Sequence, residues 1–179
     1  YLMATGSVTA WNMPNRLNFL CTVPMFHCNG WCYPWTLAML HARVICIRNI
    51  RAKEIFELIS EHKITHFGGA PIILNMLANA PKEEQIKLNH KVYVLTAAAP
   101  PPSIIFKKMK ELGFEVMHVY GLTETYGHIL QCAWNSAWDE LNEDEKADIS
   151  SRQGVRYPNT EDVKVMNPEN MKTVPNDGK

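Results

Sequence analysis

The chain has 179 residues, 46% of them hydrophobic, and its 18 Lys and Arg residues balance 18 Asp and Glu residues. This composition is typical of one soluble globular domain. A formal charge of zero argues against a broad basic surface for nucleic acid or anionic membrane, because such surfaces depend on clustered Lys and Arg. No apolar run approaches the roughly 20 residues that span a bilayer, and no targeting segment is recognisable at the start. We therefore expect a cytosolic protein without a membrane span.

The two ends of the chain indicate a fragment, and the positions of the cysteines indicate free thiols. The chain begins at Tyr1 rather than Met and ends in a turn signal, Asn-Asp-Gly-Lys, over residues 176–179, so we expect a piece of a longer protein. The five cysteines lie in apolar runs, without the dense framework of a small secreted protein, and we expect free buried thiols. Cys28 and Cys32 follow His27, but no second Cys-x-x-Cys or His pair completes a zinc set.

In chain order, the first predicted element is a strand over residues 17–25, which leads into a short apolar helix that ends at Leu40. Helical patterns follow over residues 52–59, from Pro71, and from Pro101 to Gly113. These helices alternate with four short apolar runs that have the length of buried strands, at residues 44–47, 64–67, 92–95 and 115–119. Strand, helix and strand at this pitch predict parallel strands joined by right-handed crossovers. We therefore expect an α/β fold with a doubly wound, mostly parallel sheet flanked by helices.

The last part of the chain has a different pattern. Residues 138–152 are acidic and helical in pattern, and residues 161–166 and 171–174 outline a hairpin around Asn-Pro-Glu-Asn. We expect the change from α/β to antiparallel structure near Gly154. Residues 1–153 would then form the α/β core of a larger domain, and residues 154–179 would begin a small antiparallel β-rich subdomain, both incomplete.

The residues after the last two predicted core strands are candidates for a site, because doubly wound sheets bind ligands beyond the carboxyl ends of their strands. Residues 96–100, Thr-Ala-Ala-Ala-Pro, carry small side chains that let a flat ligand approach the backbone. Residues 120–127, Tyr-Gly-Leu-Thr-Glu-Thr-Tyr-Gly, supply an aromatic face, hydroxyls and a carboxylate, which suit a nucleotide with Mg²⁺. The alternative is that Tyr120 packs in the core and that Thr123 and Glu124 cap a following helix.

Several motifs resemble one family. Residues 120–124 resemble the Tyr-Gly-x-Thr-Glu signature of the adenylate-forming superfamily, which includes AMP-forming acyl-CoA synthetases, luciferases and peptide-synthetase adenylation domains. Residues 96–100 resemble its Ser-Gly-Gly-Ala-Pro adenine loop, and residues 24–31, Pro-Met-Phe-His-Cys-Asn-Gly-Trp, resemble its segment with an aromatic–His pair at the acyl pocket. Residues 69–71, Gly-Ala-Pro, resemble the stretch that enters a helix beside the acyl and pantetheine channel.

The resemblance covers nearly the whole chain, in order and spacing. It is best for the branch of short- and medium-chain fatty acyl-CoA synthetases, through residues 25–35, 68–80 and 152–157. It identifies residues 1–153 as part of the large AMP-binding domain.

The resemblance implies a two-step ligase that uses ATP, Mg²⁺ and coenzyme A to activate a carboxylic acid through an acyl-adenylate. It implies that Tyr120 stacks on adenine, that Thr123 bonds the α-phosphate and that Glu124 holds Mg²⁺. His27 is implied near the carboxylate end of the acyl pocket. The implied catalytic residues are Thr123, Glu124 and His27; the implied nucleotide contacts are Ala97, Ala98, Ala99, Pro100, Tyr120, Gly121 and Thr123; and the implied acid contacts are His27, Trp31, Gly121 and Tyr126.

Two departures from the family pattern matter. Ala97 and Ala98 stand where the family usually has Gly-Gly, which changes how closely the backbone fits the base. The family's Gly-rich phosphate loop with its Lys is missing, since residues 4–7, Ala-Thr-Gly-Ser, have one Gly and no Lys. We expect that loop before Tyr1, and the ribose-binding Asp, the hinge and the catalytic Lys after Lys179. The chain alone is therefore expected to be inactive, and an unpaired sheet edge favours a homodimer.

Three alternatives to a fatty acyl-CoA ligase remain at this stage. The acid could be aromatic, as in a benzoate CoA ligase, because the sequence does not place the side chains that set pocket depth. A non-catalytic nucleotide- or acyl-binding module is the alternative from a different class. A dinucleotide-dependent oxidoreductase is disfavoured, because no Gly-x-Gly-x-x-Gly follows any predicted strand.

Overall fold

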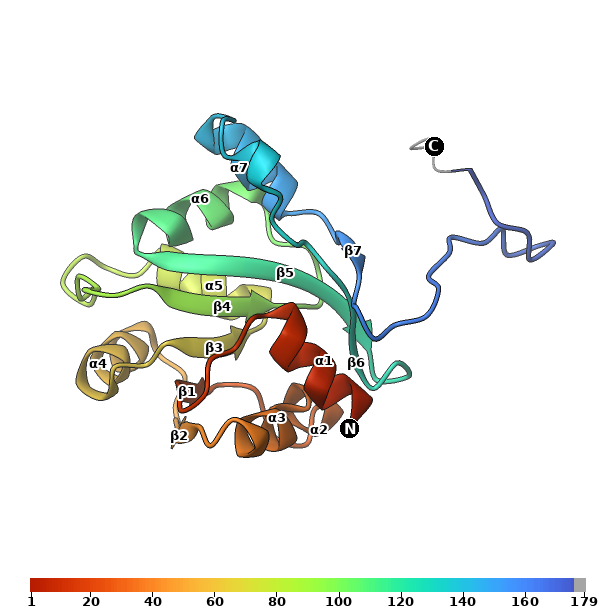
Figure 1. The fold of residues 1–179 in the computed structure, drawn as a ribbon. Coiled ribbons are helices and arrows are strands. Elements are labelled where there is room, and N and C mark those ends of the chain that lie inside the picture. The colour runs from red at the N-terminus through yellow and green to blue at the C-terminus, as the bar shows by residue number, and fades with distance from the viewer. Residues whose placement is uncertain (176–179) are drawn as a thin grey trace.

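A computed structural model describes residues 1–175 and contains a sheet with the strand order β2-β1-β3-β4-β5-β6-β7 (Figure 1). The turn predicted over residues 176–179 lies outside the described residues. The strands are β1 (Asn18–Cys21), β2 (Arg43–Cys46), β3 (His66–Gly69), β4 (Val92–Thr96), β5 (Phe114–Leu122), β6 (Gly127–Gln131) and β7 (Val155–Arg156). The helices are α1 (Leu2–Ala10), α2 (Cys28–Trp31), α3 (Tyr33–Met39), α4 (Ala52–His62), α5 (Pro71–Ala78), α6 (Ser103–Glu111), the 3₁₀ helix η1 (Ser136–Trp138) and α7 (Glu143–Ser150).

The predicted doubly wound α/β fold is confirmed. Strands β1 to β5 pair in parallel, and the order reverses at β1, which has β2 on one side and β3 on the other. The first predicted strand, over residues 17–25, is shorter than expected and covers Asn18–Cys21. Antiparallel pairing begins with β6, before the change expected near Gly154, and β7 continues the same sheet.

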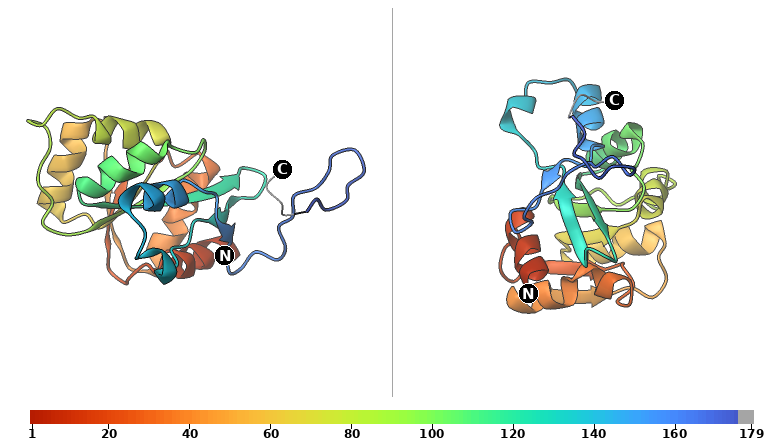
Figure 2. Two further views of the ribbon diagram at one scale, coloured as in Figure 1. Left: turned by 90° about the horizontal axis from the view of Figure 1, so that it is seen from above. Right: turned by 90° about the vertical axis from the view of Figure 1, so that its right-hand side faces the viewer.

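Helices cover both faces of the sheet (Figure 2). On one face, α4, α5 and α6 bury Ile55, Leu74 and Met109 against the sheet. On the other face, Trp11 after α1 and Leu37 of α3 pack in a second cluster. Neighbouring β1 residues divide between the two clusters, as alternation along a strand requires, and this explains why the predicted strands read as continuous apolar runs.

Helix α4 illustrates how the sequence forms these elements. Its apolar residues Ile55, Phe56 and Ile59 recur at spacings of one and three and are completely buried, while its other side carries charged residues. Burying each of these three side chains contributes about 1.5–3 kcal/mol. The helix ends where Lys63 adopts a left-handed conformation with φ of 52°.

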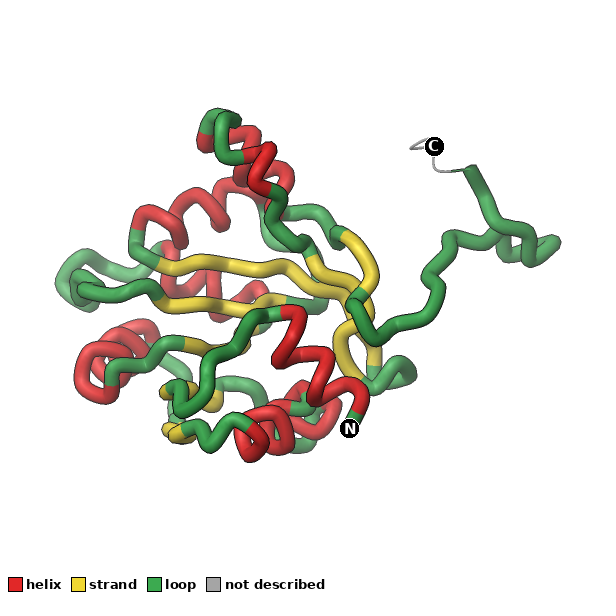
Figure 3. Tube along the Cα trace, in the orientation of Figure 1, coloured by secondary structure: helices red, strands yellow, loops and turns green. Residues whose placement is uncertain are grey.

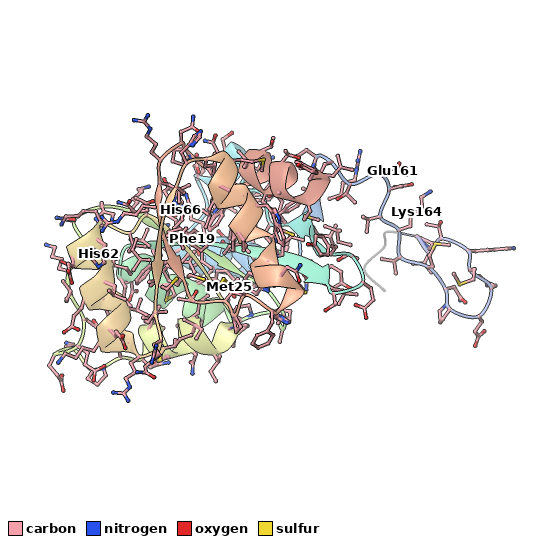
Figure 4. The ribbon with its side chains drawn as sticks, turned by 90° about the horizontal axis from the view of Figure 1, so that it is seen from below. Phe19, Met25, His62, His66, Glu161 and Lys164 are labelled. Carbon is pink, nitrogen blue, oxygen red and sulfur yellow. The ribbon has the colours of Figure 1, made fainter. Side chains whose placement is uncertain are left out.

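The C-terminal part contains the predicted acidic helix as α7, which begins at a capping box formed by Asn142 and Glu145. After β7 the chain runs away from the sheet, and Figure 4 shows Glu161 and Lys164 on this projecting segment. The predicted hairpin is present as a single bridge between Met166 and Thr173. Within residues 1–175, no helix has the length and apolar character needed to cross a membrane.

Candidate active site

The carboxyl ends of β3, β4 and β5 point to the same edge of the sheet, and the loops that follow them gather there (Figures 1 and 3). Thr96, the last residue of β4, pairs with Gly69 of β3 and with His118 of β5. Tyr120 stands two residues beyond His118, so it is level with the loop of residues 97–100 that leaves β4. The two predicted nucleotide-binding segments are therefore adjacent.

The loop after β4 has only small side chains, so it presents mainly its backbone to solvent. Ala97 is buried, whereas Ala98, Ala99 and Pro100 are exposed. Ala98 has a φ of 83°, in the left-handed region that favours glycine. The departure from Gly noted in the sequence thus falls on a position where the backbone conformation itself prefers Gly.

Residues 120–126 end β5 and form the turn of the β5–β6 hairpin. The strand continues through Leu122, so Tyr120 and Gly121 lie in it rather than after it. The hydroxyl of Thr125 fixes the turn, since it accepts from the backbone N–H of Leu122 at 2.9 Å and lies 2.8 Å from the carbonyl oxygen of Gly127, to which it donates. No helix follows, so the alternative in which Thr123 and Glu124 cap a helix is wrong. Both side chains are exposed at the turn.

Gly121 is required by the approach of the two strands of this hairpin. It pairs with His128 of β6, and the register shifts between Tyr120 and Gly121. A Cβ atom at Gly121 would overlap the carbonyl oxygen of Gly127 and lie 2.8 Å from the Cα of His128. A glycine here is therefore a packing requirement of the hairpin, independent of any ligand.

A left-handed turn, α2, covers the hairpin. Residues 28–32 all have positive φ values, between 43° and 64°, although only Gly30 among them lacks a side chain. A left-handed conformation costs a non-glycine residue about 1–2 kcal/mol, so this turn is strained. Its contacts hold it on the hairpin: Asn29 Nδ2 donates to the Tyr126 hydroxyl at 3.3 Å, and Cys28 Sγ lies 3.4 Å from Thr123 Oγ1.

The turn also places two of the four predicted acid contacts, Trp31 and His27. Trp31 is buried, with ring carbons 3.2 Å from where a Cβ at Gly68 would lie, and so rests on the end of β3. His27, just before the turn, is exposed. The turn that carries Trp31 thus lies against Thr123 and Tyr126, and the β4 loop lies on the same edge of the sheet.

His128 and Tyr157 lie behind this turn. Neither is among the acid contacts predicted from the sequence. His128 of β6 is 3% exposed, and its ring is edge-on to Trp31 at 5.2 Å between centroids. Tyr157, completely buried, has its ring centroid 6.2 Å from that of His128. Burial lowers the pKa of His128 to about 4 and raises that of Tyr157, so both rings are uncharged near neutral pH. The sequence placed His128 near the signature, but only the strand register brings it to Trp31.

The chain belongs to the AMP-binding enzyme family, whose model matches residues 1–179. It is 49% identical over 181 residues to a peroxisomal acetate/butyrate–CoA ligase of Arabidopsis thaliana, and the match covers 100% of this chain and 32% of that protein. It is 47% identical over 180 residues to an acetate–CoA ligase of Humulus lupulus, covering 99% of this chain and again 32% of the relative. The chain therefore spans about a third of the length of these relatives. One of them is peroxisomal, so the expected cytosolic location is not confirmed.

A solved structure shows the same fold. The N-terminal domain of FACL13 from Mycobacterium tuberculosis superposes with a TM-score of 0.72 at 22% identity, over 86% of this chain and 37% of that one. At this identity the likeness concerns the fold alone, and it confirms the α/β architecture expected from the sequence.

Proposed function

We propose that the chain supplies the nucleotide- and acid-binding part of an AMP-forming carboxylic acid:CoA ligase that activates a short- or medium-chain fatty acid. The main support is the strand pairing of Thr96 with His118, which brings the 97–100 loop beside Tyr120. The contacts of Cys28 and Asn29 bring the segment that we propose to bind the acid next to the β5–β6 turn. The names of the relatives, which are acetate, butyrate and 2-methylpropanoate CoA ligases, favour a short acid.

The proposed nucleotide contacts follow from the exposure of each group. The half-buried ring of Tyr120 would stack on adenine, and the exposed backbone at Ala98 and Ala99 would line its edge. The hydroxyl of Thr123, free of strand pairing at the turn, would donate to the α-phosphate. Small side chains at the loop and an aromatic ring on the neighbouring strand suit a planar base.

Glu124 fits a magnesium ion that is shared with a nucleotide. Its carboxylate is exposed at the turn, next to Thr123. In the described part of the chain no three His, Cys, Asp or Glu side chains are grouped to hold a metal by themselves. Mg²⁺ is commonly held by one or two carboxylates and substrate phosphates, so one carboxylate is sufficient here. When bound, the ion would neutralise charge on the phosphates.

The proposed reaction has two steps. A carboxylate oxygen of the acid attacks the α-phosphorus of ATP, the bond to the β-phosphate oxygen breaks, and pyrophosphate leaves. The thiolate sulfur of coenzyme A then attacks the acyl carbon of the adenylate, and AMP leaves with the electron pair of the broken acyl–oxygen bond. The residues of this chain would position the base, the acid and the phosphate, and His27 would lie beside the acid carboxylate.

The chain by itself is proposed to be unable to complete adenylation. Residues 1–179 contain no Gly-rich loop with a Lys, and we propose that this loop, the ribose-binding Asp and the catalytic Lys belong to other parts of the protein. We likewise propose that residues 1–153 belong to the core of the large domain and that residues 154–179 begin a β-rich subdomain. An exposed β2 at the sheet edge favours the dimer expected from the sequence.

The test is ATP–pyrophosphate exchange by the full-length protein, with acetate, butyrate, octanoate and benzoate offered in parallel at saturating Mg²⁺. Exchange with a fatty acid supports the proposal, and exchange with benzoate alone would make the enzyme an aromatic acid ligase. Tyr120→Ala should weaken binding of the nucleotide about 10-fold or more, from lost stacking, while Tyr120→Phe should retain it. Adenylate-analogue binding without any exchange would instead identify a binding module.

A further inference from the structure

Two of the five cysteines lie side by side at one end of the sheet. All five are free thiols, as expected from the sequence, but Cys46 is exposed rather than buried, and Cys21 is half-buried. Cys21 ends β1, Cys46 ends β2, and the parallel register pairs them directly. Strand β2 is the outermost strand at its end of the sheet within residues 1–175 (Figure 1). The fold therefore brings together two thiols that are far apart in the sequence.

The two cysteine side chains point to the same face of the sheet. Both line one cavity of about 230 Å³, together with Phe19 and Val44. Phe19 and Val44 are also a directly paired couple, two residues before the cysteines, and alternate side chains of a strand share a face. Figure 4 shows Phe19 and Met25, which lines the cavity as well. Both sulfur atoms thus face the same largely apolar space.

The separation of Cys21 and Cys46 fits a disulfide. Neighbouring strands lie about 4.7–4.9 Å apart, and disulfides join residues whose Cα atoms lie about 4.4–6.8 Å apart. Burial raises the pKa of the Cys21 thiol, and Cys46 raises it further through its charge and a hydrogen bond between the two thiols. The sulfur atoms are therefore close enough to interact before any reaction, and the backbone need not move to join them.

The other three thiols have different surroundings. Cys32 and Cys132 are buried, and each donates to a backbone carbonyl oxygen, at 3.3 Å and 3.1 Å. Cys28 lies on the left-handed turn, 3.4 Å from the hydroxyl oxygen of Thr123. None of these three is paired with another cysteine in the sheet. They serve as internal controls for the reactivity of the paired thiols.

The paired cysteines enclose the segment that we propose to bind the acid. Residues 22–45 lie between them and contain α2 and α3, with His27 and Trp31. Residues 28–32 of this segment are in the left-handed region, so its conformation is strained. A bond between Cys21 and Cys46 would close the segment into a loop. A cross-link reduces the number of open conformations, so a closed segment opens less readily.

We propose that Cys21 and Cys46 form a redox modification site, in which a peroxide oxidises the two thiols to a reversible disulfide that fastens the ends of the 22–45 segment. The importance of this segment for the acid rests on the proposed function, whereas formation of the bond does not. The exposed Cys46 reacts first, because the thiolate is the nucleophile and Cys21 is the more buried of the two.

The reaction has two balanced steps. The Cys46 thiolate attacks one oxygen of hydrogen peroxide, the O–O bond breaks, and hydroxide leaves and takes up a proton, which leaves Cys46 as a sulfenic acid. The Cys21 sulfur then attacks the Cys46 sulfur, the S–O bond breaks, and water leaves with the Cys21 proton. Two thiols and one hydrogen peroxide thus give one disulfide and two waters. Both sulfur atoms are oxidised, and both peroxide oxygens are reduced.

The experiment treats the folded full-length protein with hydrogen peroxide, blocks the remaining thiols with N-ethylmaleimide and maps the peptides by mass spectrometry. Trypsin leaves Cys21, Cys28 and Cys32 together on residues 17–43 and places Cys46 on residues 44–48. Chymotrypsin, which cleaves after Phe26, then separates Cys21 from the other two. The digest therefore identifies which cysteine is joined to Cys46.

We expect a linked peptide of Cys21 and Cys46, about tenfold or more above any other cysteine pair, and its loss after dithiothreitol. Cys132→Ser is the matched control and should form the same link. Cys46→Ser should abolish it, and Cys21→Ser should leave a Cys46 sulfenic acid that dimedone labels. The absence of a Cys21–Cys46 link in the wild-type protein overturns the proposal, as does a Cys46 that N-ethylmaleimide fails to label in the reduced, folded protein.

Hydrogen exchange over residues 22–45 tests the effect on the segment. Exchange should slow about threefold or more in the oxidised wild-type protein and stay unchanged in peroxide-treated Cys46→Ser. A linked protein that exchanges as fast as the reduced one overturns the proposed fastening. Neither measurement needs ATP or an acid, so both remain decisive if the proposed ligase activity is not found.

Discussion

Replacing Gly121 with Ala tests the geometry on which the candidate site depends. The added methyl group would overlap the carbonyl oxygen of Gly127 and lie 2.8 Å from the Cα of His128. Carbon atoms in contact are separated by about 3.5–4.0 Å, so β6 must move away by about 1 Å. The clashing atoms belong to the backbone, and no change of side-chain rotamer relieves them. We expect a loss of about 1–3 kcal/mol in the free energy of unfolding, as for other overpacked sites.

The same displacement should impair catalysis more than stability. Thr123 and Glu124 lie in the turn that Gly121 supports, and a shift of about 1 Å in a positioning group costs on the order of 100-fold in rate. Urea denaturation of the full-length protein measures the first effect, and ATP–pyrophosphate exchange at saturating substrates measures the second. Gly69→Ala is the stability control, because its methyl would lie 3.2 Å from the Cβ of Ile73, so α5 need move by only a few tenths of an ångström, and its expected loss is smaller, about 1 kcal/mol. A Gly121→Ala protein with the wild-type urea midpoint and exchange rate would refute this reasoning.

Three further outcomes follow from the structure. Burial lowers the pKa values of His66 and His128 to about 4, from the ordinary 6.5, so the unfolded chain binds more protons than the folded chain between these pH values. The contribution of each histidine to the free energy of unfolding should therefore be complete above about pH 6.5 and fall by roughly 3 kcal/mol toward pH 4. Urea midpoints measured over this pH range should fall less in the His66→Phe protein than in the wild-type protein. Ala98→Gly should raise the melting temperature, by relieving about 1 kcal/mol of strain at a φ of 83°, and calorimetry that shows a lower melting temperature contradicts the loop conformation. Glu124→Gln should raise the Mg²⁺ concentration needed for half-maximal exchange about tenfold or more without changing the urea midpoint, because its side chain is exposed, and an unchanged Mg²⁺ requirement excludes the role proposed for its carboxylate.

The core strands and helices could be predicted because their signals are local. Helix α4 has an apolar stripe, and β4 is a short apolar run in which every residue except Tyr93 is buried. Helix α1 could not be found this way, because Leu2–Ala10 has no apolar stripe, and it is held by contacts with α3 and β6 instead. The short strand β6 follows a turn of Thr, Glu and Tyr and has a His at its second residue, which is not a typical strand pattern.

The site was predictable only as far as its motifs extend. The loop after β4 and the signature could be identified from the resemblance, and the strand pairing brings them together. The left-handed conformation of residues 28–32 could not be predicted from the sequence, since only Asn29 and Gly30 of these five residues favour it. Propensity alone would predict a right-handed helix or a loop, and the contacts with Thr123 and Tyr126 override it.

The identity of the β6 residue opposite Gly121 depends on a single irregularity in the β5–β6 hairpin. Tyr120 pairs with Leu130, but Gly121 pairs with His128, so one residue of β6 is passed over between them. Without this bulge Gly121 would face Ile129, and the residue of β6 nearest the signature would be apolar. Because side chains alternate across a strand, a shift of one residue would also turn His128 away from Trp31. A bulge of one residue therefore decides whether the β6 residue opposite Gly121 is a hydrocarbon side chain or a hydrogen-bonding ring, and no local sequence pattern specifies where it falls.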